Sequence, residues 1–314
     1  FFNANDPPIA KMSTPAAATG GTRGGAGTAA ADEKAKREAG EKAKREAGEK
    51  AKREAVRAVK KRIDDAEEKE DCSIVMTALK EAGEAEVAAY ALKSLVYFAK
   101  GTDRKGKVVE LGGLKAALEA MRKFDADAEV QRGGADVLAW MARKGTEMGQ
   151  KIASEGGIEV FLKAVRGFPD NEKVLEKNLK ALGNLASGNP DNKVKIAAAR
   201  GIEVAIEALK KHPEAIEVQR LGCKMLGQVA ANNPDNQVKI AEKGGIEVTI
   251  EALKRHPGNE GVQEYGCFVL YWMVDLKSVH LKIKKGKEQL EYAKSTYPNH
   301  ANSQQYSKEA LEAL

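Results

Sequence analysis

Apolar residues recur at a helical interval along most of the chain. Ile246, Ile250 and Leu253, for example, stand at positions i, i+4 and i+7, a spacing that places their side chains on one face of an α-helix. No stretch alternates apolar and polar residues in the way that a half-buried β-strand requires. The pattern therefore predicts an all-α protein.

The predicted helices come in groups of three, separated by turn residues. In one group the turn Asn233-Pro234-Asp235-Asn236 precedes a short helix, and Asn236 is the predicted N-cap of that helix. Gly244 and Gly245 end it, because glycine readily adopts the left-handed conformation of a helix C-cap. His256-Pro257-Gly258 ends the helix that follows. The three helices of this group are predicted over residues 236–243, 246–255 and 260–274.

The groups repeat with a period of 44 residues. Gly113, Gly157, Gly201 and Gly245 are each one period apart. Three further sets share this spacing: Val130, Val174, Val218 and Val262; Leu138, Leu182, Leu226 and Leu270; and Val108, Ile152, Ile196 and Ile240. A helical unit with one apolar face cannot bury that face alone, so such units stack into a continuous core. We therefore expect a right-handed α-solenoid of about six three-helix units, of which the first is partial and the last degenerate.

The residues before the repeats have a different composition. Residues 1–31 are rich in Ala, Gly, Thr and Pro and are predicted to be disordered. From residue 33 the octet EKAKREAG occurs twice and then returns as EKAKREAV. Its Glu and Arg residues form i,i+4 pairs, such as Glu33 with Arg37, in the order that stabilises a helix. The chain is thus predicted to consist of a disordered segment (1–31), a charged helical arm (32–71) and the solenoid (72–314).

Charge and composition exclude several classes of function. The chain has 52 basic and 46 acidic side chains, a net charge of +6, and this small excess does not indicate nucleic acid as a partner. The basic octets are interleaved with glutamates and lack aromatic residues, which also argues against nucleic-acid binding. The longest apolar run, Cys267–Val274, is far shorter than the roughly 20 residues of a membrane-spanning helix. No transmembrane segment is predicted.

The cysteines indicate a reducing compartment. Cys72, Cys223 and Cys267 form no CxxC motif and leave one thiol unpaired in any disulfide scheme, which is untypical of secreted proteins. We expect a cytoplasmic protein, with the nucleus as the alternative. A chain that begins Phe1-Phe2 without a methionine leaves open a targeting signal that is missing from this sequence.

No set of residues indicates catalysis or metal binding. His212 and His256 are one period apart and each precedes a turn proline, which is typical of a helix end and not of a metal site. Cys223 and Cys267 stand beside glycines and are predicted to be small core residues. No Ser/His/Asp or Cys/His arrangement stands out. We therefore expect no enzyme activity, no cofactor, no metal and no small-molecule substrate.

One segment carries a resemblance to a known family. Ala181-Leu182-Gly183-Asn184-Leu185-Ala186, together with the short Asn-opened helix and the Gly-Gly-Ile corner, resembles the armadillo repeat, and the resemblance covers about residues 72–314. The period falls in the armadillo/HEAT range of about 40–47 residues and excludes the 34-residue tetratricopeptide and 33-residue ankyrin units. The resemblance implies an armadillo-type solenoid whose third helices line a concave groove for extended peptides, with Asn184 clamping the peptide backbone.

The period places further residues in this groove. Lysines there would favour an acidic or phosphorylated segment of a protein partner, and tryptophans would serve as aromatic anchors. In the alternative interpretation the tryptophans complete the core and the lysines are solvated. The predicted groove residues are Tyr97, Trp140, Lys180, Asn184, Lys224, Gln228, Phe268 and Trp272.

Three functions are consistent with this pattern. The first is a non-catalytic protein–protein interaction scaffold that binds its partner along the concave groove. The second is an importin-alpha-like nuclear transport adapter, because a basic helix precedes the repeats; the tryptophans that such adapters place four residues before the asparagine are replaced here. Those places hold Lys93, Asp136, Lys180, Lys224 and Phe268. The third is a structural subunit of a large assembly.

Overall fold

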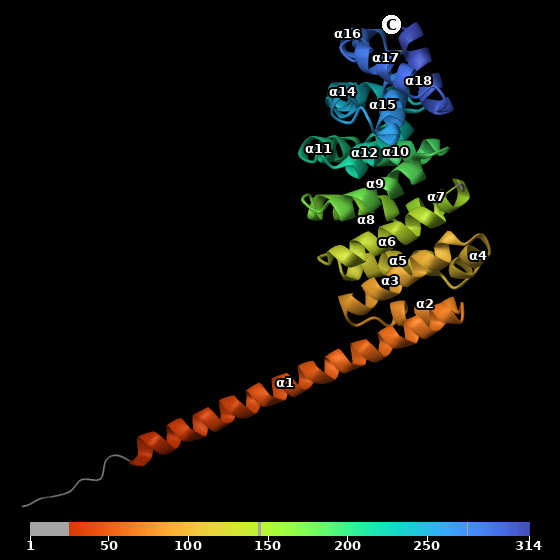
Figure 1. Cartoon of the computed structure of the whole chain (residues 1–314). Helices are drawn as coiled ribbons and strands as arrows, with labels where there is room; N and C mark the ends of the chain where they lie inside the picture. Colours follow the sequence, from red (N-terminus) through yellow and green to blue (C-terminus); the bar gives the residue numbers. More distant parts are fainter. Residues whose placement is uncertain (1–24, 144–145, 275) are drawn as a thin grey trace, which may run out of the picture. The chain divides into compact units, whose positions relative to one another are not determined.

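The computed structural model describes residues 25–143, 146–274 and 276–314, and within these ranges it contains helices and no β-strand (Figure 1). The prediction of an all-α protein is confirmed. Most of the predicted disordered segment, residues 1–24, lies outside the described ranges. The chain divides into two compact units between Ala55 and Val56.

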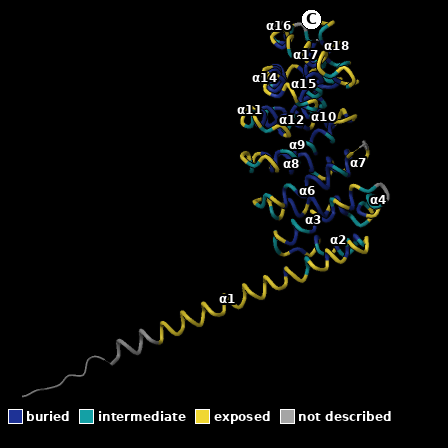
Figure 2. The backbone as a smooth tube through the Cα atoms, in the orientation of Figure 1, coloured by how far each residue is buried: buried dark blue, intermediate teal, exposed yellow. Residues whose placement is uncertain are grey.

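One long helix, α1 (Gly25–Glu68), contains the charged octets. It begins at Gly25 instead of residue 32, because the alanines at 29–31 favour a helix. Residues 33–55 are exposed throughout (Figure 2). The predicted i,i+4 pairing is present, with 3.7 Å between Arg37 Nη2 and Glu33 Oε1, although a pair this exposed contributes little stability.

The last part of α1 belongs to the second compact unit. Val56, Ile63 and Ala66 are buried there, and Tyr90 Oη donates a 2.6 Å hydrogen bond to Asp64 Oδ1. These apolar residues occur at helical spacing, so this part of α1 supplies an apolar face to the first, partial repeat. The second unit therefore begins at residue 56 and not at residue 72.

The second unit is a stack of layers that each contain a second and a third helix (Figure 1). The second helices are α2 (Cys72–Lys80), α5 (Gly113–Lys123), α8 (Gly157–Gly167), α11 (Gly201–Lys211), α14 (Gly245–Arg255) and α17 (Lys287–Thr296). The third helices are α3 (Ala85–Lys100), α6 (Ala128–Met141), α9 (Glu172–Ala186), α12 (Ile216–Ala230), α15 (Glu260–Met273) and α18 (Ala301–Glu312).

The four middle layers also have a short first helix. These helices are α4 (Thr102–Glu110), α7 (Thr146–Ser154), α10 (Pro190–Ala198) and α13 (Pro234–Glu242). In the last layer a 3₁₀ turn (Lys277–Val279) and α16 (His280–Lys284) take this place. The solenoid of six units, with a partial first unit and a degenerate last one, is thus confirmed. No described helix is both long enough and apolar enough to span a bilayer.

The periodic glycines and isoleucines pack against each other at the corner between the first and the second helix of a unit. A Cβ atom at Gly201 would lie 2.5 Å from Ile196 Cγ2 and 2.8 Å from the Ile196 carbonyl oxygen, so only glycine fits there. Ile152, Ile196 and Ile240 are all 0% exposed. The periodic side chains therefore occupy equivalent buried places, which is the condition for a stacked solenoid.

Buried amides join successive layers. Asn233, and not the predicted Asn236, caps α13, because Pro234 occupies the first helical position and Asn233 Oδ1 accepts from Asn236 N at 3.0 Å. The Asn236 side chain instead donates to the Lys193 and Val229 carbonyl oxygens at 3.3 and 3.1 Å. Such a bond satisfies backbone groups that would otherwise be buried without a partner.

Glutamines clamp the end of most second helices to the following third helix. Gln219 Nε2, for example, donates to the Leu209 and His212 carbonyl oxygens at 2.8 and 2.9 Å. The same pair of bonds is made by Gln131, Gln263 and Gln304. These side chains fix four of the third helices, α6, α12, α15 and α18, relative to their second helices.

Candidate protein-binding site

The predicted groove residues all lie on third helices, which pack against one another in succession from α3 to α18. Tyr97 lies on α3, Trp140 on α6, Lys180 and Asn184 on α9, Lys224 and Gln228 on α12, and Phe268 and Trp272 on α15. Because the helices stack with a fixed period, these residues share one register along the stack; its exposed and half-buried members are called here the third-helix face. The row that they form brings residues of neighbouring units into contact.

Asn184 is bonded to both neighbouring third helices. Its Nδ2 donates to the Ala139 carbonyl oxygen on α6 at 2.9 Å, and its Oδ1 accepts from Lys224 Nζ on α12 at 3.2 Å. One N–H of the side-chain amide remains for a ligand, because an amide nitrogen carries two protons. Asn184 therefore links three units and is not a fully free clamp.

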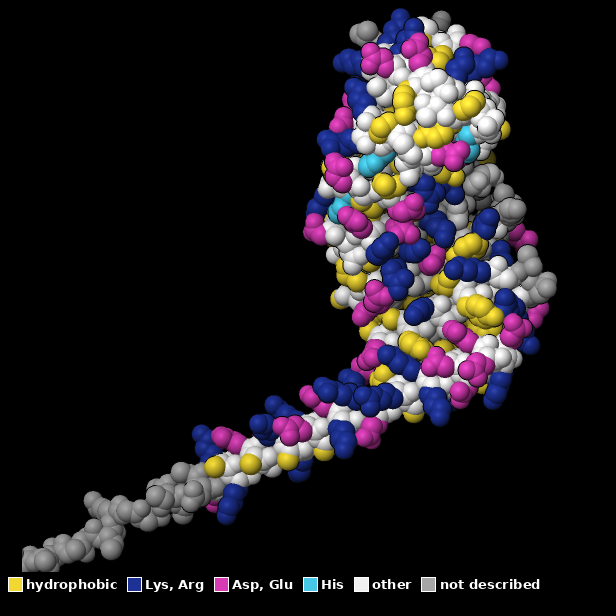
Figure 3. Space-filling model, in the orientation of Figure 1, with side chains coloured by type: hydrophobic (Ala, Val, Ile, Leu, Met, Phe, Trp, Pro, Cys, Tyr) yellow, Lys and Arg dark blue, Asp and Glu magenta, His cyan; other side chains and the backbone are white. Residues whose placement is uncertain are grey.

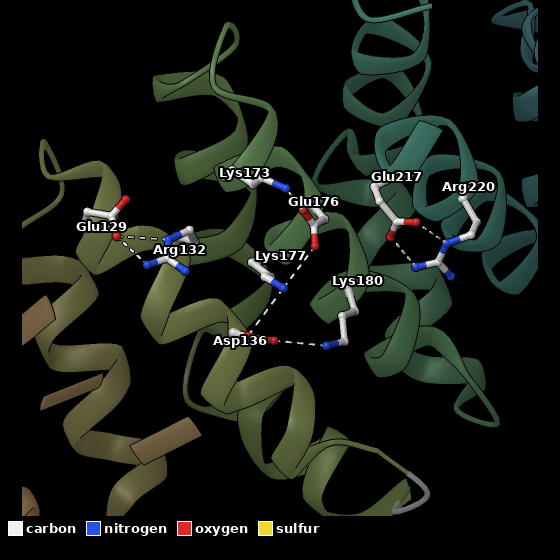
Figure 4. Close-up of polar contacts among 9 residues, drawn as sticks. All are labelled: Glu129, Arg132, Asp136, Lys173, Glu176, Lys177, Lys180, Glu217 and Arg220. Carbon is white, nitrogen blue, oxygen red and sulfur yellow. Dashed lines mark hydrogen bonds and ion pairs between the residues drawn. The ribbon is translucent and has the colours of Figure 1, made fainter. Parts of the chain in front are cut away.

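Lys180 lies between a carboxylate and an aromatic ring. Its Nζ is 3.0 Å from Asp136 Oδ1 and 4.7 Å from the centroid of the Trp140 ring. Asp136 is only 8% exposed and is also 3.5 Å from Lys177 Nζ (Figure 4). Lys177 Nζ also lies 3.0 Å from Glu176 Oε1, so the two ammonium groups are shared between two carboxylates.

A second row of charges lies towards the N-terminal ends of α6, α9 and α12, and sequence reasoning missed it. Each helix has an i,i+3 ion pair there: Glu129 with Arg132, Lys173 with Glu176, and Glu217 with Arg220 (Figure 4). The signal was available, because the members of these pairs are one period apart.

The order of charges in this second row reverses on α9, where the cation Lys173 precedes the carboxylate Glu176. The hydrogen bond from Arg220 holds the pKa of Glu217 below its ordinary value, and the charges of Arg220, Lys173 and Lys177 add to this effect. The pKa of Arg220 is raised, chiefly by its hydrogen bond to Glu217, with the charge of Glu176 on α9 contributing. The row is therefore largely neutralised within and between the helices.

Cations gather around Trp140 without the same compensation. Besides Lys180, Arg143 Cζ is 5.0 Å and Lys100 Nζ is 5.7 Å from the centroid of its ring. Burial lowers the pKa of Lys224, and the nearby charges of Arg220, Lys180 and Arg143 lower it further, while the nearby carboxylate of Glu264 acts in the opposite direction. Lys100, Arg143, Lys180 and Lys224 are called here the basic cluster. Of these four, only Lys180 has an ion pair with a carboxylate in the described part of the chain.

The aromatic residues divide between core and surface. Phe268 is 8% exposed, and its ring centroid is 4.8 Å from that of Tyr306 and 6.2 Å from that of Trp272. Phe268 therefore has the register of a groove residue but is packed in the core. Tyr97 is 42% exposed, and the Arg104 guanidinium lies 4.2 Å from its ring centroid. Trp140 and Trp272 are half-buried.

The histidines and cysteines have structural roles. His212 Nε2 and His256 Nε2 each donate to the turn-proline carbonyl of the preceding unit, Pro169 and Pro213, at 2.7 Å. Burial raises the pKa values of Cys223 and Cys267 to about 12, as expected for the predicted core residues. Among the residues that the model describes, no group of three or more His, Cys, Asp or Glu side chains is placed to hold a metal ion.

Stacked three-helix units with a Gly-Gly corner define the class: the second compact unit is an armadillo-type α-solenoid. Residues 112–314, more than half of the chain, match the family model described as the LRRK2 ARM repeat. The chain therefore belongs to the LRRK2 ARM repeat family. A search among curated proteins finds no significant match.

Several solved structures share the fold. An engineered protein is 22% identical with a TM-score of 0.68, over 77% of this chain and 98% of its own. A designed armadillo repeat protein is 22% identical with a TM-score of 0.65, over 76% of this chain and 98% of its own. Another, in complex with the peptide (KR)4, is 22% identical with a TM-score of 0.63, over 76% and 97%. At these identities the likeness concerns the fold alone.

Proposed function

We propose that this chain is a non-catalytic interaction scaffold that binds an extended, acidic or phosphorylated segment of another protein along its third-helix face. The basic cluster around Trp140 carries the proposal. A designed armadillo repeat protein with the same fold was obtained in complex with the basic peptide (KR)4, which supports peptide binding by this fold. The cations on the present face favour the opposite charge.

The arrangement of the face supports an extended ligand. Lys180 and Lys224 lie one unit apart on neighbouring third helices, and Lys224 donates a hydrogen bond to Asn184 on the helix that carries Lys180. An extended segment that crosses the third helices would meet these cations in turn, with the remaining Asn184 N–H directed at its backbone. The half-buried Trp140 ring adds apolar contact area, and aromatic side chains of this kind are typical of the residues that contribute most to binding energy.

A nuclear transport adapter is less consistent with this surface. A basic localisation peptide would be repelled by the basic cluster, because like charges at an interface cost binding energy. In Figure 3 basic and acidic side chains are interleaved over the middle of the stack, and no large acidic patch is visible on the side shown. The peptide experiment below includes a basic probe, so that binding of this kind would be detected.

The test is a selection from a library of displayed random 12-residue peptides, panned against the full chain. Selected peptides are labelled with fluorescein, and their Kd values are measured by fluorescence anisotropy beside (KR)4. We expect acidic sequences whose Kd rises with salt, since ion pairing at an exposed surface is screened. Selection of basic peptides, or stronger binding of (KR)4, would contradict the proposal.

Matched variants locate the binding surface. Lys180→Gln/Lys224→Gln removes two charges from the third-helix face, and Lys195→Gln/Lys239→Gln removes two exposed charges from the first helices α10 and α13. The two residues within each pair are one period apart, so both variants lose the same charge and change equivalent positions in two units. We expect the first variant to raise the Kd about tenfold and the second to leave it unchanged. Equal effects would mean that the peptides bind elsewhere or only by net charge.

A further inference from the structure

The basic cluster differs from the rest of the third-helix face in its charge balance. The N-terminal row of Glu129/Arg132, Lys173/Glu176 and Glu217/Arg220 is paired within each helix. Around Trp140, by contrast, Lys100 and Arg143 have no carboxylate partner among the described residues, and only Lys180 is paired there, with the buried Asp136. Unpaired positive charge thus lies beside this ring, at the end of α3 and just after α6.

The cations of the basic cluster come from four successive units. Lys100 is the last residue of α3, Arg143 follows α6, Lys180 lies on α9 and Lys224 on α12. Three of them lie within 4.7–5.7 Å of the centroid of one indole ring, whereas Lys224 Nζ is bonded to Asn184 and lies 5.8 Å from the centroid of the Tyr265 ring. The convergence of Lys100, Arg143 and Lys180 on one ring requires the stacked fold, because these residues are far apart in the sequence.

We propose that the basic cluster contains a subsite for a phosphorylated side chain of the bound segment, with the phosphate held by Lys100 and Arg143 beside the Trp140 ring. This inference rests on the proposed function and adds to it a place and a chemical class. A phosphomonoester carries a charge of about −1.5 to −2 and three acceptor oxygens. Lys100 and Arg143, which have no carboxylate partner among the described residues, together match that charge, whereas the single charge of a carboxylate would leave one of them uncompensated.

Arg143 is the member best suited to the phosphate. A guanidinium presents several N–H donors in a planar fork that fits phosphate oxygens, and a lysine acts chiefly as a point charge. Arg143 and Lys100 are both exposed, so a ligand can reach them without rearrangement of the core. Lys180 stays paired with Asp136, and its ammonium group lies against the Trp140 ring from the neighbouring third helix, α9.

The probe is an oriented library of 12-residue peptides with a fixed central phosphoserine, glutamate or serine. The full chain is incubated with each library, and the Kd of the strongest phosphopeptide is then compared with its Glu and Ser counterparts by fluorescence anisotropy. We expect the phosphopeptide to bind about tenfold more tightly than either counterpart. Inorganic phosphate is added as a competitor, and only millimolar concentrations are expected to displace the peptide.

The variant Lys100→Gln/Arg143→Gln tests the assignment of residues. It is expected to abolish the preference for phosphoserine while the serine peptide keeps its Kd. Lys195→Gln/Lys239→Gln is the control for charge and should retain the preference. Because both pairs are exposed, a circular dichroism spectrum and a thermal unfolding curve are sufficient to show that each variant folds.

The outcomes separate this inference from the proposed function. If serine, glutamate and phosphoserine peptides bind equally and Lys180→Gln/Lys224→Gln still weakens them, the phosphate subsite is refuted and the scaffold stands. If no peptide in any library binds, both fail. Vesicles with and without phosphoinositides form the last arm; retention on the phosphoinositide vesicles without any phosphopeptide preference would also overturn the inference.

Discussion

Gly227 on α12 is the position at which the stacking of third helices can be tested most directly. A Cβ atom there would lie 2.8 Å from Phe268 Cε1 on α15 and closer still to Cδ1. The Phe268 ring has little room to move, since it already packs against Tyr306 and Trp272. Gly227→Ala should therefore force the two units apart or displace the ring.

The expected magnitude follows from two opposing effects. Overpacking in a filled core costs about 1–3 kcal/mol, and the confined aromatic ring places Gly227→Ala near the upper end. Replacing a glycine inside a helix by alanine returns about 1 kcal/mol. The net loss in the free energy of unfolding is therefore roughly 2 kcal/mol, and for a chain of this size about 4–8 °C in the melting temperature.

Gly106 provides the matched control. It is exposed in the interior of α4, and a Cβ atom there would meet nothing within 4 Å. Gly106→Ala should raise the melting temperature, because it gains helix propensity without a clash. Thermal unfolding followed by circular dichroism compares the two variants with the wild-type chain. A melting temperature for Gly227→Ala equal to or above that of the wild type would refute the contact between α12 and α15.

Further predictions concern the inter-layer amides, the thiols and the charge row. Asn236→Ala removes a buried amide that serves two carbonyl groups and should cost about 1–3 kcal/mol in urea unfolding. With pKa values of about 12, Cys223 and Cys267 should react with an alkylating reagent at pH 8 only when the protein unfolds, as mass spectrometry can show. Because the pKa of Glu217 is depressed in the folded state by Arg220, its contribution is present above the ordinary pKa of 4.5 and is lost as the pH falls through the folded value. Glu217→Gln should therefore lower the melting temperature at pH 7 slightly and reduce the difference between pH 7 and pH 3; an unchanged difference would contradict the pairing.

Much of the fold could be predicted because the repeat is defined by residues that act locally, at the corners and ends of helices. The corner glycines and the isoleucines that precede them mark every full unit, and the helix ends near Gly245 and Pro257 are set by short-range backbone preferences. The choice between Asn233 and Asn236 as the cap was wrong, because both are suitable residues and only the position of Pro234 in the first turn decides between them.

The site was less accessible to sequence reasoning. The period put Phe268 in the correct register, but its depth depends on a glycine in the preceding unit, Gly227. Likewise the repeat period places the polar Asn184 in the groove register, whereas its bonds to Ala139 and Lys224 depend on how closely three helices approach one another. Such distances are set by the packing of side chains that the period does not specify.

The sequence by itself determined the class of the protein, because a constant interval between apolar residues permits burial only if equivalent units stack. The tertiary structure alone decided which charges remain available for a partner. Lys180 and Arg143 both lie against the Trp140 ring, yet Lys180 is compensated by Asp136 of the neighbouring unit, whereas Arg143 has no carboxylate partner among the described residues. The physical reason is that Coulomb energy depends on the distance between groups, and here the decisive distances join residues about one repeat apart in the chain.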